Sequence, residues 1–212
     1  MESEHEQDGG TVDPDGAANP DRSVNDRPDD LEPWKRTGSE SGDSMMLFRP
    51  RVDTLINPRS GESLRRVVLE TPDWVNVVAR TARGELVFVK QFRFGSASMT
   101  FEVPGGMVDR GEDPADAARR ELREETGYSS ARWTNLGPVQ PNPAFHDNLC
   151  HHFLAEDVEL TDPQELDRGE DIAIVLIPER EVAERVRSGE IAHSLVITAL
   201  SRVMDLRLNG GG

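Results

Sequence analysis

The chain has 212 residues, enough for one domain with a substantial core and additional tails. Its formal net charge is −16, and residues 1–44 carry 13 Asp and Glu against 4 Lys and Arg, a net of −9. Nucleic acids and anionic membrane surfaces attract clustered positive charge, so we expect neither as a partner.

The cysteine content and the hydropathy pattern bear on the compartment. Cys150 is the only cysteine, so an intramolecular disulfide is excluded and a reducing compartment is expected. No apolar run approaches the ~20 residues of a membrane span. The N-terminal segment lacks the basic start and apolar centre of a secretory signal. We therefore expect a cytoplasmic protein.

The composition divides the chain into four parts. Residues 1–30 are rich in Asp, Glu, Gly, Pro and Asn, and cannot bury enough apolar surface to become ordered. We predict a disordered acidic tail there, an N-terminal β-hairpin subdomain over 31–74, a larger domain over 75–208 and a disordered tail over 209–212.

Two apolar segments predict the subdomain. LFRPRVDTLI and LRRVVLE flank the turn-forming stretch NPRSG, so residues 46–71 are expected to form an antiparallel hairpin. The preceding stretch TGSESGDS, residues 37–44, is expected to be turn-like. Trp74 is expected to anchor the core.

The larger domain is predicted to mix strands and helices. Strands are predicted at 75–81, 86–91, 100–103, 133–136, 151–155 and 171–177, and helices at 179–187 and 193–208. The run DIAIVLI is almost continuously apolar and should be a buried strand.

A further helix has well-marked ends. Asp113 suits the N-cap, Pro114 suits the first helical position, and Gly127 suits a left-handed C-terminal stop. The positions spaced for one buried face are Ala115, Ala118 and Leu122.

A second stripe of this helix is acidic. Glu121, Glu124 and Glu125 bring like charges together near the negative end of the helix, where repulsion and the macrodipole both oppose them. The stripe could be a solvated face neutralised by neighbouring arginines. Alternatively, hard divalent cations offset the charge, because Mg²⁺ takes carboxylate oxygens as ligands.

The complete pattern favours the second reading. Gly106 is followed after five residues by Glu112, and after seven more by RELREETG, residues 120–127. This resembles the signature of the Nudix hydrolases, G-x5-E-x7-R-E-U-x-E-E-x-G-U with U aliphatic, at every fixed position. Only Tyr128, at the last position, departs from it.

The resemblance implies an α/β fold, the Nudix α/β/α sandwich with a mixed β-sheet, here preceded by the antiparallel hairpin. It implies cleavage of a diphosphate with Mg²⁺ or Mn²⁺ held by the three glutamates of the stripe. A carbonyl of the glycine loop is the further expected ligand, and Gly105 is the position we choose. The residues implied to be structural are Gly106, Glu112, Arg120 and Gly127, with a salt bridge between Glu112 and Arg120.

The substrate must be read from outside the signature. VKQFRFG at 89–95, FEVPGG at 101–106 and Pro143, which lies 16 residues after Gly127, resemble the ADP-ribose and nucleoside-diphosphate-sugar pyrophosphatase branch. The predicted function is Mg²⁺-dependent hydrolysis of such a sugar to a nucleoside monophosphate and a sugar phosphate. The alternatives are a house-cleaning pyrophosphatase of (deoxy)nucleoside triphosphates and a catalytically silent Nudix ligand sensor.

Several residues are predicted to contact the substrate or the reacting water. Arg93 has the shape to bind phosphate in a bidentate manner, and Glu102 is expected to orient the site or contact a ribose. Pro143 and Phe145 are predicted on the substrate side, with Phe145 stacking on a base. The resemblance implies a loop glutamate as catalytic base; Glu170 is the first choice and Glu165 the alternative.

A homodimer is predicted through residues 46–71, because the hairpin would otherwise leave an exposed sheet edge. The alternative is that the hairpin folds back on its own chain. In the resembled branch the N-terminal sheet is shared between subunits, which implies that Arg51 reaches the substrate of the partner.

Deleting residues 1–30 should leave the fold and the activity intact, because that segment has little apolar surface to contribute. Circular dichroism and a diphosphatase assay on the truncated protein check this. Loss of activity in folded, soluble protein would contradict the prediction.

Overall fold

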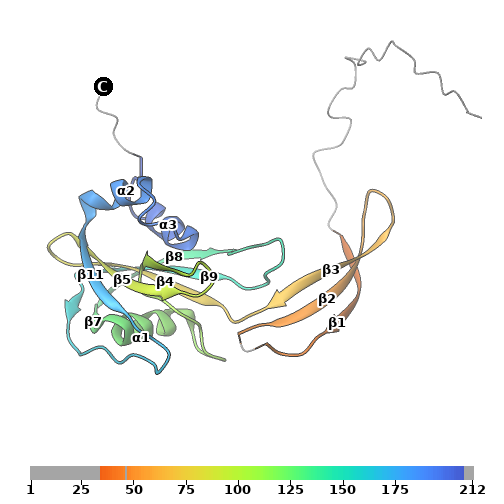
Figure 1. Ribbon diagram of the computed structural model, residues 1–212, viewed down its shortest axis with the longest axis horizontal. Helices are drawn as coiled ribbons and strands as arrows, with labels where there is room; N and C mark the ends of the chain where they lie inside the picture. The colour runs from red at the N-terminus through yellow and green to blue at the C-terminus, as the bar shows by residue number, and fades with distance from the viewer. Residues whose placement is uncertain (1–33, 46, 208–212) are drawn as a thin grey trace, which may run out of the picture.

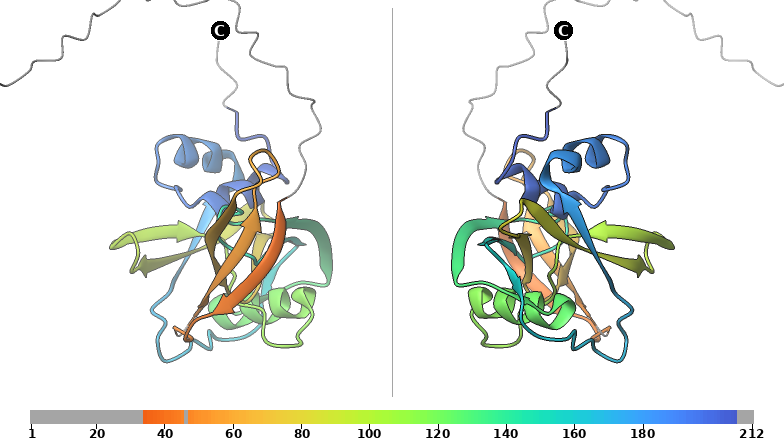
Figure 2. Two further views of the ribbon diagram at one scale, coloured as in Figure 1. Left: turned by 90° about the vertical axis from the view of Figure 1, so that its right-hand side faces the viewer. Right: turned by 90° about the vertical axis from the view of Figure 1, so that its left-hand side faces the viewer.

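The computed structural model describes residues 34–45 and 47–207 (Figure 1). The predicted tails at 1–30 and 209–212 lie outside the described residues. A three-stranded antiparallel sheet comes first, formed by β1 (Lys35–Ser41), β2 (Arg49–Ile56) and β3 (Ser63–Glu70). It extends to one side of the larger domain (Figures 1 and 2).

The larger domain is built on a six-stranded mixed sheet with the order β11-β5-β4-β9-β8, in which β6 also pairs with β5. Its strands are β4 (Trp74–Arg80), β5 (Glu85–Arg93), β6 (Ser98–Glu102), β8 (Arg132–Val139), β9 (Cys150–Glu156) and β11 (Ala173–Pro178). Strands β4 and β9 pair in parallel. A small ribbon of β7 (Tyr128–Ser129) and β10 (Glu159–Leu160) lies beside it.

Helices cover both faces of this sheet (Figure 1). Helix α1 (Pro114–Thr126) buries Ala117, Ala118 and Leu122 against one face, whereas α2 (Glu179–Arg187) and α3 (Ser194–Ser201) pack on the other. The strands contribute Val75, Val77 and Ala79 to the first core and Val78, Leu86 and Phe88 to the second. The predicted α/β/α sandwich with a preceding antiparallel subdomain is confirmed.

Strands β4 and β5 diverge, and this opening positions the glycine loop. They pair only at Ala79 and Arg80. Toward the start of β4 the loop pairs instead: the Val75 N–H donates to the Gly106 carbonyl (2.9 Å) and the Val77 N–H to the Pro104 carbonyl (2.8 Å). The loop therefore runs along β4 at the open end of the sheet.

The expectation of turns at 37–44 was wrong, because β1 occupies residues 35–41 and pairs with β2. All of its side chains are exposed, so no apolar alternation marks the strand in the sequence. Because β1 buries no side chain, it is stabilised by pairing with β2 and by the Ser39 hydroxyl, which donates a hydrogen bond to the buried Asp53 (2.6 Å). The hairpin of β2 and β3 was predicted correctly, but it is part of a sheet whose third strand, β1, was not predicted.

The C-terminal elements differ in how well they were predicted. Helix α2 has the predicted bounds, whereas α3 ends at Ser201, well before residue 208. The chain then turns, because the Arg202 guanidinium donates to the carbonyls of Gly137 (2.9 Å) and Pro138 (3.2 Å) and ties this segment to β8. Among the described residues, no helix is both long enough and apolar enough to cross a membrane.

Candidate active site

Helix α1 begins and ends as its sequence predicts. The Asp113 carboxylate accepts a hydrogen bond from the Ala115 N–H (2.8 Å), and Pro114 is the first helical residue. Gly127 adopts φ 71°, and its N–H donates to the Arg123 carbonyl (2.7 Å). These caps fix the rotation and length of the helix, and hence the direction of its acidic stripe.

The glycine loop is pressed between β4 and the acidic stripe. A side chain at Gly105 would place its Cβ 2.1 Å from the Val75 carbonyl oxygen, and one at Gly106 would place it 2.4 Å from a Glu121 carboxylate oxygen. The Gly105 N–H donates to Glu125 (2.8 Å). Only glycine allows backbone and carboxylates to approach this closely.

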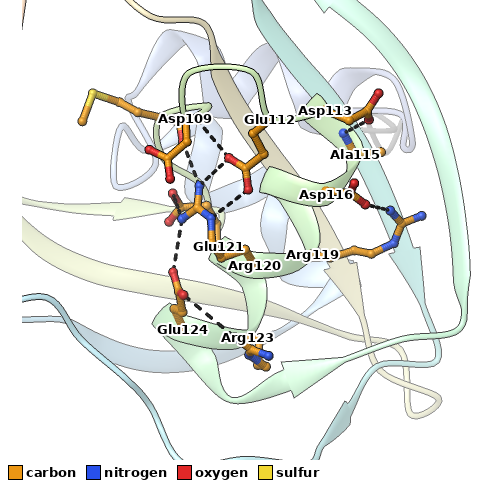
Figure 3. Close-up of polar contacts among 11 residues, drawn as sticks. Asp109, Glu112, Asp113, Ala115, Asp116, Arg119, Arg120, Glu121, Arg123 and Glu124 are labelled. Carbon is orange, nitrogen blue, oxygen red and sulfur yellow. Dashed lines mark hydrogen bonds and ion pairs between the residues drawn. The ribbon is translucent and has the colours of Figure 1, made fainter.

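Arg120 is the cation within the Nudix-like motif, and its contacts are drawn in Figure 3. Its guanidinium donates two hydrogen bonds to Glu112, each 3.0 Å, and further bonds to Glu121 (2.9 Å), Glu124 (3.2 Å) and the Met107 carbonyl (3.0 Å). The bond from Arg120 lowers the pKa of Glu112. The predicted pair of Glu112 and Arg120 is therefore present, and it ties the loop before α1 to the helix.

Two carboxylates of the stripe resist ionisation. Burial raises the pKa of Glu125 to about 8, and the charges of Glu121 and Glu170 act in the same direction. Burial likewise raises the pKa of Glu121 to about 6, with Glu124 and Glu170 contributing repulsion. The described chain thus concentrates negative charge that its own cations do not fully offset.

The donor set suits a hard divalent cation. Carboxylate and backbone carbonyl oxygens are the ligands that Mg²⁺ and Mn²⁺ prefer, and a cation beside Glu121 and Glu125 would favour their ionised forms. In the present side-chain arrangement, no three His, Cys, Asp or Glu residues of the described chain converge closely enough to hold an ion. Arg120 lies between Glu121 and Glu124, so those side chains must turn away from it before both can bind a cation.

A cavity of about 660 Å³ contains this stripe. One part of its wall is acidic, with Glu121, Glu124, Glu125 and the loop residues Glu165, Asp167 and Glu170. Another part is apolar and aromatic, with Leu47, Phe48, Leu69, Trp74 and His146. The Trp74 and His146 rings meet edge to face with centroids 6.0 Å apart.

Arg93 and Glu102 form a third part of the cavity wall. The Arg93 Nε and one Nη each donate to Glu102 at 2.7 Å, and Thr100 donates a third bond of 2.7 Å. Burial alone would raise the pKa of Glu102, but the bonds from Arg93 and Thr100 hold it below its usual value. Glu102 therefore fixes Arg93 at the cavity rather than facing the cavity as a free carboxylate.

Three predicted substrate contacts are not brought into this cavity lining. The Arg51 guanidinium is already engaged by Asp53 (3.0 Å), Glu70 (2.5 Å) and Asp147 (3.1 Å), so it joins the N-terminal sheet to a loop of the larger domain. Pro143 and Phe145 lie exposed on that same loop. Phe145 instead packs edge to face on His146, with ring centroids 4.9 Å apart.

The cavity also contains residues for which the sequence predicted no role in the site; an ordinary loop role was favoured for His146, although its loop was expected beside the substrate pocket. Trp74, expected in the core, lines the cavity instead, and so do His146 and His193. Trp74 begins β4, whose apolar residues suggest burial, but its side chain is only partly buried. No motif marks the two histidines, because separate loops bring them to the cavity.

Comparisons with known proteins agree with this geometry. The NUDIX domain model matches residues 70–195. An ADP-ribose pyrophosphatase of Bacillus subtilis (strain 168) is 34% identical over 133 residues, 62% of this chain and 72% of that protein. One of Mycobacterium tuberculosis (strain ATCC 25618 / H37Rv) is 32% identical over 172 residues, 80% and 83% of the two chains.

A solved structure extends the comparison to the fold. The crystal structure of an ADP compounds hydrolase matches with a TM-score of 0.70 and 22% identity, covering 82% of this chain and 94% of that one. The chain belongs to the Nudix family and is a Nudix hydrolase. Enzymes of this family generally need divalent metal ions.

Replacing Glu125 by Gln should stabilise the metal-free protein at alkaline pH. The folded-state pKa of about 8 exceeds that of an unfolded glutamate, so the wild type loses stability as pH rises between the two values, by at most about 1.4 kcal/mol per pH unit. Glutamine carries no charge to bury. In urea unfolding with EDTA, the free energy of unfolding of the variant should rise relative to that of the wild type between pH 5 and pH 8.5.

The exposed Glu62 provides a matched control, since Glu62→Gln should show no comparable pH-dependent gain. If Glu125→Gln were no more stable than the wild type at pH 8.5, ionised Glu125 would not destabilise the metal-free protein, and the prediction would be wrong.

Proposed function

We propose that this hydrolase cleaves the diphosphate of ADP-ribose or a related nucleoside-diphosphate sugar with Mg²⁺, giving a nucleoside monophosphate and a sugar phosphate. The observation that carries the proposal is the single cavity in which the acidic stripe of α1 faces Arg93 and the glycine loop. The names of the Bacillus and Mycobacterium relatives point to the same substrate class.

The proposed cation ligands are Glu121, Glu124, Glu125 and the carbonyl of Gly105. The carbonyls of Pro104 and Gly106 bond to β4, whereas that of Gly105 accepts no hydrogen bond from the described residues, which leaves its oxygen available. A divalent cation held there would neutralise diphosphate charge and activate water.

The remaining roles belong to the side chains themselves. Arg93, held by Glu102, would donate to diphosphate oxygens and orient the scissile P–O bond. Water attacks one phosphorus, the bridging oxygen leaves with the other phosphate, and a carboxylate accepts the proton of the water. Glu112, Arg120, Gly106 and Gly127 would hold this arrangement without touching the substrate.

The geometry favours Glu170 as the proton acceptor. Glu170 lines the cavity, and its charge contributes to the raised pKa values of Glu121 and Glu125. Glu165 also lines the cavity, and its N–H donates to the Glu124 carbonyl (2.9 Å).

A (deoxy)nucleoside triphosphatase and a silent ligand sensor are the rival functions. The retention of Glu121, Glu124 and Glu125 opposes a silent site. A substrate panel of ADP-ribose, GDP-mannose and several dNTPs with Mg²⁺ tests the proposal, and the sugars should give the highest kcat/KM. Preferred turnover of a dNTP would support the first rival, and tight binding without turnover the second.

Glu125→Gln is the matched inactive control for this panel, and it should lose at least about tenfold in turnover, or about 1.4 kcal/mol of transition-state stabilisation.

The two loop glutamates can be distinguished directly. Glu170→Gln should lower kcat at least about a hundredfold, as expected for loss of a general base, while Glu165→Gln should lower it less than about fivefold. Both effects are measured at saturating ADP-ribose and Mg²⁺. The reverse order would reassign the base to Glu165.

We also propose a cytoplasmic homodimer built through the N-terminal sheet. Its described surface exposes the apolar side chains of Met45, Leu47 and Val67 at 56, 58 and 55% of their full area. Strand β1 is an edge whose side chains are all exposed. Packing this surface against a second copy of the chain would cover both the apolar side chains and the free edge of β1.

In such a dimer Arg51 would meet the substrate of the partner rather than its own. Light scattering on protein lacking residues 1–30 should give twice the monomer mass. A fully active monomer at tens of micromolar would contradict both the dimer and the shared site.

A further inference from the structure

His193 lines the cavity at the entry to α3, but neither the Nudix motif nor the proposed mechanism uses it. It lies on the wall formed by Arg93 and Glu102. Its Nδ1 is 3.4 Å from the Glu102 carboxylate, is shielded from solvent and has no hydrogen-bond partner among the described residues.

The carboxylate selects the tautomer of this histidine. A nitrogen lone pair 3.4 Å from a carboxylate oxygen would be repelled, so Nδ1 of the neutral ring carries the proton. The side chain is 39% exposed although Nδ1 is not, which leaves the Nε2 edge as the part facing the cavity. Nε2 of the neutral ring then presents a hydrogen-bond acceptor.

The Nε2 atom of His193 accepts a hydrogen bond, whereas the neighbouring Arg93 guanidinium only donates. Arg93 is a donor and can be satisfied by phosphate oxygens. Oxygens of an ionised phosphate offer no proton to Nε2, whereas a sugar hydroxyl does. The wall therefore combines a donor for phosphate with an acceptor suited to a hydroxyl next to that phosphate.

We infer that His193 is a specificity-determining residue that accepts a hydrogen bond from a hydroxyl of the sugar on the distal phosphate. It thereby favours nucleoside-diphosphate sugars over nucleotides that end in a phosphate. This inference rests on the proposed function and extends it to the group that distinguishes the two substrate classes.

The test compares ADP-ribose with ADP on the full chain with Mg²⁺. His193→Phe keeps an aromatic ring but removes the acceptor, and should raise the KM for ADP-ribose about fivefold to tenfold with kcat nearly unchanged. The Ki of ADP as a competitive inhibitor should change less than about twofold. His193→Gln, whose amide oxygen can take the place of Nε2, should recover most of the ADP-ribose affinity.

Two controls keep the result interpretable. Ser194→Ala changes an exposed neighbour outside the cavity lining and should leave both constants unchanged. Melting temperatures verify that each variant folds, and His193→Ala replaces the phenylalanine variant if that one does not.

Equal changes for ADP-ribose and ADP, or a glutamine variant no better than phenylalanine, would overturn the inference while leaving the proposed function in place. A wild-type chain that hydrolyses no nucleoside-diphosphate sugar would instead overturn the proposed function, and with it the sugar contact.

Discussion

The close approach of the glycine loop to the buried carboxylates of α1 is the constraint on which the rest of the site depends. Gly106 leaves no room for a Cβ beside Glu121, and the Gly105 N–H is directed at Glu125. The loop can occupy this place only because β4 and β5 diverge and leave the start of β4 free to pair with it. The loop backbone therefore lies between the start of β4 and the acidic stripe of α1.

This arrangement places carboxylates that repel one another at the site, and a neighbouring arginine offsets part of the repulsion. Glu121 and Glu125 are buried with raised pKa values, and Arg120 offsets part of the charge while anchored by Glu112. Under the proposed function, a divalent cation bound between these carboxylates in place of Arg120 would relieve their repulsion. The apolar cores on both faces of the sheet hold α1 in place against this repulsion.

The cavity places chemically different walls around one volume. The acidic wall suits a cation, the wall of Arg93, Glu102 and His193 suits a phosphate with an attached hydroxyl, and the aromatic wall of Trp74 and His146 suits a planar group. A nucleoside-diphosphate sugar bound together with a divalent cation would present all three of these chemistries. The N-terminal subdomain contributes Leu47 and Phe48, from the connection between β1 and β2, and Leu69, from β3, to the same cavity. It is therefore part of the cavity wall as well as a proposed dimer surface.

The sequence by itself determined the elements whose physical cause is local. The caps Asp113 and Gly127, the spacing of Ala118 and Leu122 and the fixed residues of the motif specified helix α1, its acidic stripe and the family. It did not reveal β1, because a wholly exposed strand has no apolar alternation and depends on pairing with β2. Only the tertiary structure decided that Arg51 is held by three carboxylates, that Trp74 lines a cavity, and that His193 meets Glu102. The contacts of Arg51 with Asp147 and of His193 with Glu102 join residues far apart in the chain, and no local sequence pattern encodes them.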